Sequence, residues 1–173
     1  SAGAMRLNIG GTKRKDGWKI LNVTPGPDVD FLGDIRNLDE FESGSCQEIY
    51  ASHVIEHVDQ NQIVNTLRGL HRLLIPGGRL YISVPDLSVL CHQFLNPRFD
   101  QPERYHVMRM IFGGQTDSHD YHQIGLSLEF MADFLGKAGF YSVEQVEAFN
   151  LFNDTSTFAP YGTPISLNLV AIK

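Results

Sequence analysis

The chain has 173 residues, of which 42% are hydrophobic, and this length and composition suit one compact domain with a sizeable core. Its net charge of −6 and its one short basic run, Lys13–Lys15, exclude a general binder of nucleic-acid phosphates, so we expect no nucleic-acid partner. No apolar run approaches the roughly 18 residues that cross a bilayer, so we expect no membrane-spanning segment.

The residues ahead of Met5, Ser1–Ala4, read as a cloning remnant, so the domain is expected to cover residues 5–173. No secretory or transit leader is recognisable after Met5. Cys46 and Cys91 are far apart and form no C-x-x-C motif, which is typical of reduced thiols. These features predict a cytoplasmic protein.

Four short apolar runs in the first part of the chain predict strands, because each stops at glycine, proline or polar residues. They lie at residues 5–9, 18–23, 28–35 and 47–52. About seven and six residues separate the first three runs, whereas a parallel crossover normally takes a dozen or more. Either extended loops replace helices here or one pair of strands is antiparallel. We expect a sheet whose first half has little helical cover.

A helix is predicted to begin near Asp59, because apolar residues then recur on one face, at Ile63, Leu67, Leu70 and Leu74. Pro76–Gly78 is expected to end this helix, and residues 79–85 have the composition of a strand.

Beyond that strand, residues 87–126 give no regular pattern except a helix-like run at 88–95. A further helix is predicted over 127–140, with Ser127 as its N-cap, and two strands follow near 141–149 and 165–173. Strands that alternate with helices predict an α/β fold with a mostly parallel sheet.

The stretch His53-Val-Ile-Glu56-His57 matches the H-x-x-E-H signature of one class of zinc peptidase. That site requires both histidines on one long helix and a third ligand from elsewhere, for which Glu129 is a distant candidate. The residues before His53 read as a strand, and the predicted helix begins only after His57. A zinc hydrolase is therefore a remote alternative, and we expect no metal site.

The order of these signals resembles a known family. The motifs run through LNIGG (7–11), GWKILN (17–22), VDFLGDIRNL (29–38), IYASHVIEHV (49–58), LHRLLIPGGRLYISVPDL (70–87) and HQIGLSLEFMADFLGKAGF (122–140). Together they resemble a small class I S-adenosylmethionine-dependent methyltransferase, closest to short bacterial predicted methyltransferases of the type 11 kind that are often associated with cell-surface polysaccharide gene clusters. The resemblance implies a Rossmann-like, mostly parallel, seven-stranded sheet that is helix-poor in its first half.

The resemblance also implies S-adenosylmethionine as cofactor, bound at the carboxyl ends of the strands. Backbone at Gly10 and Gly11 would approach the methionine moiety, with Thr12 where the family's G-x-G pattern has its second glycine. Asn22 stands where the family places an acidic residue that binds the ribose hydroxyls, and an amide makes weaker, uncharged hydrogen bonds there. The remaining cofactor contacts implied are Asp34, the Ile35 backbone amide, Ser52 and His53.

The acceptor implied is an oxygen or nitrogen of a small molecule or sugar-type compound. His53, His119 and His122 are the candidate catalytic residues, because one of them could take the acceptor proton. The segment 116–122 could equally be a solvated loop, and Glu56 could be purely structural. His71 and His92 read as packing or surface histidines, Asp86 as a site or capping residue, and Trp18 as a packing anchor.

A second hypothesis is a methyltransferase-like domain that binds partners without catalysis, suggested by Thr12, Asn22 and the missing helices. Because few helices cover the first strands, we also expect a homo-oligomer that buries an exposed apolar surface there.

Overall fold

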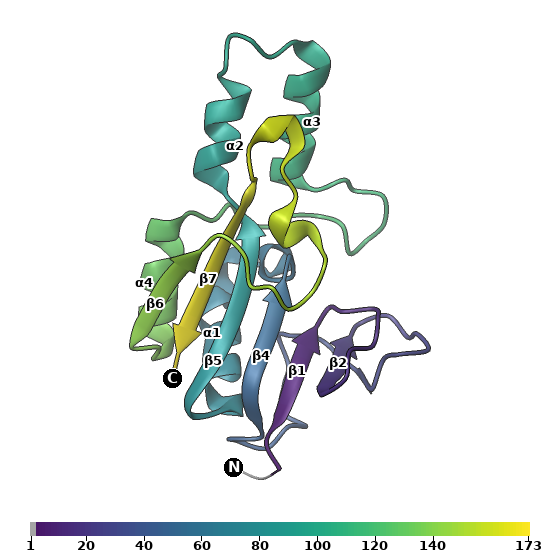
Figure 1. Cartoon of the computed structure of the whole chain (residues 1–173), viewed down its shortest axis with the longest axis vertical. Helices are drawn as coiled ribbons and strands as arrows, with labels where there is room; N and C mark the ends of the chain where they lie inside the picture. The colour runs from purple at the N-terminus through teal and green to yellow at the C-terminus, as the bar shows by residue number, and fades with distance from the viewer. Residues whose placement is uncertain (1–2) are drawn as a thin grey trace.

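The computed structural model describes residues 3–173, so Ser1 and Ala2 of the predicted cloning remnant lie outside the described residues. Its centre is a seven-stranded sheet in the order β3-β2-β1-β4-β5-β7-β6 (Figure 1). The strands are β1 (Met5–Ile9), β2 (Trp18–Asn22), β3 (Phe31–Leu32), β4 (Cys46–Ser52), β5 (Leu74–Pro85), β6 (Ser142–Val146) and β7 (Ser166–Ile172). The α-helices are α1 (Ile63–Leu73), α2 (Leu87–Phe94), α3 (Gln101–Phe112) and α4 (Leu128–Ala138), joined by short 3-10 turns, among them η1 (Ile55–His57) and η2 (Gln60–Gln62).

The first three strands are all parallel, which decides between the two predicted alternatives. β1 pairs in parallel with β2 and with β4, and β2 pairs in parallel with β3. Extended loops therefore replace crossover helices in this half, as the short spacings allow. Only β7 runs antiparallel to its neighbours β5 and β6. The predicted α/β class, with a mostly parallel and helix-poor first half, is confirmed.

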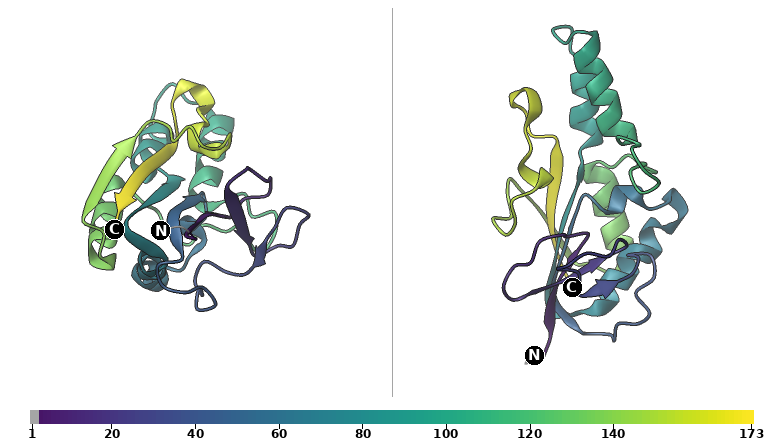
Figure 2. Two further views of the ribbon diagram at one scale, coloured as in Figure 1. Left: turned by 60° about the horizontal axis from the view of Figure 1, so that its bottom comes forward. Right: turned by 90° about the vertical axis from the view of Figure 1, so that its right-hand side faces the viewer.

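The two faces of the sheet have different covers (Figure 2). Helices α1 and α4 lie on one face, where a stripe of buried apolar residues on each helix packs against the strands to form the main core. The other face is crossed by the segment 147–165, which Figure 1 shows looping over the upper ends of the strands. The carboxyl ends of the parallel strands thus lie at the border between two covering layers, where open α/β sheets place their sites.

Aromatic side chains fasten the segment 147–165 to the sheet. Phe152 packs edge-on against Trp18, with ring centroids 5.3 Å apart, and Phe149 packs against Tyr50 at 5.6 Å. The Tyr50 hydroxyl donates to Asp154 over 2.6 Å. The predicted packing role of Trp18 is confirmed, since only 8% of that residue is exposed.

The helix-poor first half exposes two large apolar side chains, Val23 just after β2 and Leu32 in β3, and it also carries the polar pair Arg6–Glu48 at 3.1 Å. Self-association itself stays a prediction.

The helical segment begins next to Asp59, as predicted, because η2 runs directly into α1 at Ile63, but the Asp59 side chain forms no cap. The predicted end of this helix is wrong. Pro76–Gly78 lies inside β5, because Leu74 already pairs with Cys46 of β4 and a bulge accommodates the glycines. The prediction for α4 is confirmed, since Ser127 Oγ accepts from the Phe130 amide and Gly139 closes the helix in a left-handed conformation.

The unassigned region folds into α2 and α3, which project from the top of the molecule in Figure 1 as a helical hairpin. In this described part of the chain, as in the rest of residues 3–173, no helix has both the length and the apolar character that a membrane crossing requires.

Candidate functional site

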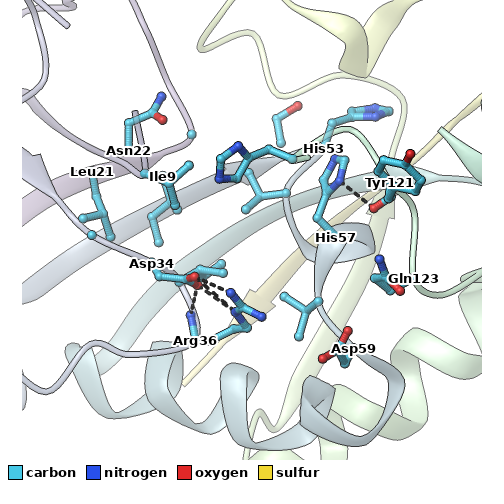
Figure 3. Close-up of a pocket in the computed structure, with 18 of the residues that line it drawn as sticks. Ile9, Leu21, Asn22, Asp34, Arg36, His53, His57, Asp59, Tyr121 and Gln123 are labelled. Atoms are coloured by element: carbon cyan, nitrogen blue, oxygen red, sulfur yellow. Dashed lines mark hydrogen bonds and ion pairs between the residues drawn. The ribbon is translucent and has the colours of Figure 1, made fainter. Parts of the chain in front are cut away.

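A cleft of about 360 Å³ opens at the carboxyl ends of β1, β2 and β4 (Figure 3). Leu21 and Ile9 form an apolar wall, and polar side chains from residues 34–36, 52–59 and 118–123 face the same space. The cleft lies where open α/β sheets usually bind their ligands. Its polar lining residues include Asn22, Asp34, Arg36, Ser52, His53, His57, Asp59, His119, Tyr121 and Gln123.

The turn after β1 needs glycine at position 10. Gly10 has φ +84°, and a Cβ built there would lie 2.7 Å from Val54 Cγ2. Its amide donates to the Leu21 carbonyl over 2.8 Å, which ties the turn to β2. A side chain would both strain the backbone and close the wall of the cleft.

The side-chain amide of Asn22, which the sequence analysis expects to bind a ribose, also makes two hydrogen bonds to the backbone. Its Nδ2 donates to the Gly11 carbonyl over 2.9 Å, and its Oδ1 accepts from the Thr24 amide over 3.0 Å. One amide hydrogen and one lone pair of Oδ1 remain for a ligand. Asn22 thus joins the ends of β1 and β2, a role that a carboxylate could not fill because it cannot donate to a carbonyl.

Asp34 is paired with Arg36, a residue that sequence reasoning missed. Arg36 Nη2 lies 2.6 Å from Asp34 Oδ2, and Arg36 Nε lies 3.0 Å from Oδ1, as the dashed lines in Figure 3 show. The Arg36 backbone amide adds a bond of 2.9 Å to Oδ1. The hydrogen bond from the Arg36 side chain holds the pKa of Asp34 below its usual value. The only available signal was the two-residue spacing, which is typical of an Asx turn.

His53 follows β4 in a strained conformation, with φ 55°, which is uncommon for a residue other than glycine. Its amide donates to the Ser83 carbonyl over 2.8 Å, which fixes it to β5. Its Nε2 lies 2.7 Å from Ser166 Oγ, and its Nδ1 lies 3.3 Å from Glu56 Oε2. One ring nitrogen is therefore hydrogen-bonded, and the other lies beside the Glu56 carboxylate.

A second cavity of about 430 Å³ adjoins the first and shares His53 and His57 with it. It opens toward α3 and the segment 147–165. Polar groups surround it, and its lining includes Glu56, His106, Arg109, Asp120, His122 and Thr155. Two adjoining cavities with a histidine-bearing wall in common could hold a donor and an acceptor side by side.

The predicted cofactor residues divide between two cavities. Gly10, Asn22, Asp34, Ile35, Ser52 and His53 line the first cleft. Gly11 and Thr12 instead line a third cavity of about 330 Å³, beside Tyr50 and Asp154. Gly10, Ser52 and His53 border both spaces, so the glycine turn separates them.

The predicted catalytic histidines also separate. His53 lies where the cavities meet, while the exposed His119 is at the rim of the first cleft and His122 is in the wall of the second. Burial lowers the pKa of His122, which favours its neutral form.

Other candidate polar residues have structural roles. Asp86 accepts from the Ser88 amide over 3.1 Å and caps α2, and His71 packs edge-on against Phe140. Asp120 accepts from the Thr116 hydroxyl over 3.0 Å, which closes a loop. His92 is exposed on α2, as predicted for a surface histidine.

His53 and His57 do not share a helix, so the zinc-peptidase geometry is wrong. His53 ends the strand with a positive φ, and His57 closes η1. Glu129, the distant acid, lies exposed at the start of α4. The residue that joins Glu56 and His57 is instead His122, which sequence spacing could not identify because 65 residues separate it from His57.

Residues 14–82 match the model of a methyltransferase domain family. No curated protein sequence shows a significant match to the chain.

Solved structures share the whole fold. A SAM-dependent methyltransferase from Archaeoglobus fulgidus aligns with a TM-score of 0.63 and 15% identity, over 99% of this chain and 87% of its own. An S-adenosylmethionine-dependent methyltransferase from Mesorhizobium loti aligns with a TM-score of 0.61 and 16% identity, over 99% and 91%. The Burkholderia thailandensis 1,6-didemethyltoxoflavin-N1-methyltransferase, solved with that compound and S-adenosylhomocysteine, aligns with a TM-score of 0.60 and 14% identity, over 99% and 72%.

At identities of 14–16%, these structural alignments show a common fold. The family match covers β2, β3, β4 and α1, and the ends of β2, β3 and β4 with the residues that follow them line much of the first cleft. Residues 14–82 thus resemble a methyltransferase domain, and the chain as a whole has the fold of S-adenosylmethionine-dependent methyltransferases.

Proposed function

We propose that the protein transfers the methyl group of S-adenosylmethionine to an oxygen or nitrogen of a small-molecule or sugar-type acceptor. The observation that carries this proposal is the pair of adjoining cavities at the end of β4, with His53 and His57 in their common wall. The cofactor would occupy the first cleft and the acceptor the second. The Burkholderia enzyme of the same fold, which holds S-adenosylhomocysteine and a small-molecule substrate together, supports this division.

In the first cleft, the remaining lone pair and hydrogen of Asn22 would bind the ribose hydroxyls. The Asp34 carboxylate would accept from the adenine amino group, with the Ile35 backbone beside it. Apolar Leu21 and Ile9 would pack against the ring and ribose. Gly10, which leaves room for close backbone approach, would border the methionine moiety, and the buried Ser52 hydroxyl could donate to it.

Catalysis would come chiefly from positioning. The methyl group moves from sulfur to the acceptor atom, the bond to sulfur breaks, and S-adenosylhomocysteine leaves. His53 would take the acceptor proton, because it borders both cavities and is hydrogen-bonded to Ser83 and Ser166. His119 and His122 are the alternative acceptor contacts, at the rim and the far wall.

The experiment that tests the placement is a titration with S-adenosylhomocysteine followed by amide chemical shifts. We expect shifts at Gly10, Asn22, Asp34 and His53. Shifts confined to Thr12, Lys13 and Asn153, which line the third cavity, would contradict this assignment of the cofactor site.

The competing proposal is a domain that has kept the fold and lost catalysis. Two observations favour it, because Arg36 already pairs with Asp34 and Asn22 already bonds two backbone groups. Native mass spectrometry of the freshly purified protein separates the two proposals. Co-purified S-adenosylmethionine or S-adenosylhomocysteine would count against the scaffold.

Two further expectations remain proposals, a cytoplasmic location and a homo-oligomer. Light scattering at tens of micromolar decides the second, and a monomer there would contradict it.

A further inference from the structure

Three side chains with metal-ligand chemistry converge in the wall of the second cavity. Glu56 and His57 come from η1, and His122 comes from the loop before α4. Their ligand atoms all lie within 4.8 Å of one another. The rings of His57 and His122 meet edge to face with centroids 5.0 Å apart.

Glu56 has a carboxylate that lacks a sufficient partner. The residue is 2% exposed, and neither carboxylate oxygen accepts a hydrogen bond from any of residues 3–173. The nearest ring nitrogens are His53 Nδ1 at 3.3 Å and His57 Nε2 at 4.0 Å from Oε2. A buried carboxylate without compensation costs several kcal/mol, so the site calls for a cation.

The surrounding hydrogen bonds fix which ring nitrogens are free. His57 Nδ1 lies 3.0 Å from the Tyr121 carbonyl, and His122 Nδ1 lies 3.1 Å from the Ile111 carbonyl. A carbonyl oxygen only accepts, so each Nδ1 carries the hydrogen and each Nε2 has a lone pair. Histidines that bind metals commonly donate their other ring N–H to a carbonyl in this way.

His53 lies at the edge of the cluster. Ser166 Oγ donates to the Thr155 carbonyl over 3.0 Å, so it accepts from His53 Nε2. His53 Nδ1 lies 3.3 Å from Glu56 Oε2. The Nε2 lone pairs of His57 and His122 and the Glu56 carboxylate thus lie close together, and a cation there would relieve their repulsion.

We propose that Glu56, His57 Nε2 and His122 Nε2 bind a divalent transition-metal ion, with Zn²⁺ as the best match to two imidazoles and one carboxylate. Bonds of about 2.0–2.2 Å place ligand atoms roughly 3.4 Å apart in a tetrahedron, so the atoms would close by at most about 1.4 Å. Three protein ligands leave a coordination position open, which is the arrangement of catalytic rather than structural zinc.

The open position would face the acceptor. All three ligands line the second cavity, and His57 also borders the first cleft. This role deepens the proposed methyl transfer and rests on it: a metal-bound hydroxyl of the acceptor would lose its proton more readily and be oriented toward the methyl group. The zinc-hydrolase alternative required His53 and His57 as metal ligands on one helix. The site proposed here has His122 in place of His53, and its metal would bind the acceptor of a methyl transfer.

The test is calorimetric titration of chelator-treated, tag-free protein with Zn²⁺, with no cofactor present. We expect one equivalent to bind, and His122→Ala to weaken the affinity at least 10-fold. His119→Ala, which removes an exposed histidine of the same loop, is the matched control and should leave the affinity unchanged. No stoichiometric binding, or equal affinity in His122→Ala, would overturn the site.

Glu56→Gln covers the case in which His122→Ala does not fold, because it keeps the shape of the side chain. It should lower zinc affinity at least 10-fold while it preserves or raises the melting temperature of the zinc-free protein, since it removes an uncompensated buried charge. Unchanged zinc affinity in folded Glu56→Gln would overturn the proposal. Binding of S-adenosylhomocysteine is measured separately on zinc-free protein, so failure of the metal site and failure of the proposed function are distinguishable.

Discussion

Replacement of Asp34 by alanine is the sharpest test of the adenine contact. The carboxylate is the one charged acceptor that the proposal assigns to the cofactor, and a hydrogen bond to a charged group contributes about 1.5–3 kcal/mol. Its side chain is 36% exposed, so water competes for the bond and the lower value applies. About 1.5 kcal/mol corresponds to a roughly 10-fold increase in the Kd for S-adenosylhomocysteine.

The assay is isothermal calorimetry of wild type, Asp34→Ala and two controls. Asp39→Ala removes an exposed aspartate outside the cleft and should bind as wild type does. Arg36→Ala frees the Asp34 oxygens from their ion pair, so its affinity should equal or exceed that of wild type. A Kd for Asp34→Ala within twofold of wild type would refute the assignment of adenine to Asp34.

Gly10→Ala and Gly17→Ala share φ +84°, but only Gly10 meets a neighbour, Val54 Cγ2 at 2.7 Å. Backbone strain of about 1–2 kcal/mol should lower the melting temperature of both variants by about 2–8 °C, and only Gly10→Ala should also bind the cofactor more weakly. Equal cofactor binding by both variants would argue against a close approach of the cofactor to the backbone at Gly10. Tyr50→Phe should cost about 1.5–3 kcal/mol in urea denaturation at pH 7, because it removes a bond to a carboxylate, whereas Tyr141→Phe, on the exposed Tyr141, should cost nothing measurable. Burial alone would raise the pKa of Asp154, but hydrogen bonds from Ser156 and Tyr50 outweigh it and lower that pKa. The loss of stability in Tyr50→Phe should therefore be full above about pH 3.9 and should shrink as the pH falls through the pKa that Asp154 has in the folded protein. A stability loss that does not change with pH would contradict this. Burial raises the pKa of the Cys46 thiol to about 11, whereas Cys91 is exposed, so Ellman's reagent at pH 8 should modify one thiol per native chain and two after unfolding. Rapid reaction of the folded Cys91→Ser variant with the reagent would contradict this, because it would show that Cys46 is accessible.

Most of the sheet could be predicted from the sequence because its strands are short, β-branched or aromatic, and bounded by glycine or proline. The same reasoning failed where the periodic signal was missing. Helix α3 buries only Val107, so no apolar stripe distinguishes it from a loop. Pro76–Gly78 looked like a terminator, yet pairing of Leu74 with β4 carries the strand through it.

The position of the first cleft could be predicted from the order of motifs, since ligand sites lie at strand ends in this fold. The side chains and cavities that the site residues contact could not be predicted. Nothing in the sequence shows that Arg36 pairs with Asp34 or that Gly11 and Thr12 face a different cavity. The burial of Glu56 depends on a loop 60 or more residues away, so tertiary packing alone reveals it.

The central claim is that the cleft at the ends of β1, β2 and β4 binds S-adenosylmethionine. Calorimetric titration of the zinc-free protein with S-adenosylhomocysteine tests it most directly. The structure predicts a saturable isotherm with one molecule bound per chain, accompanied by a rise in melting temperature that grows with ligand concentration. No heat of binding and no thermal stabilisation at millimolar ligand would contradict the claim.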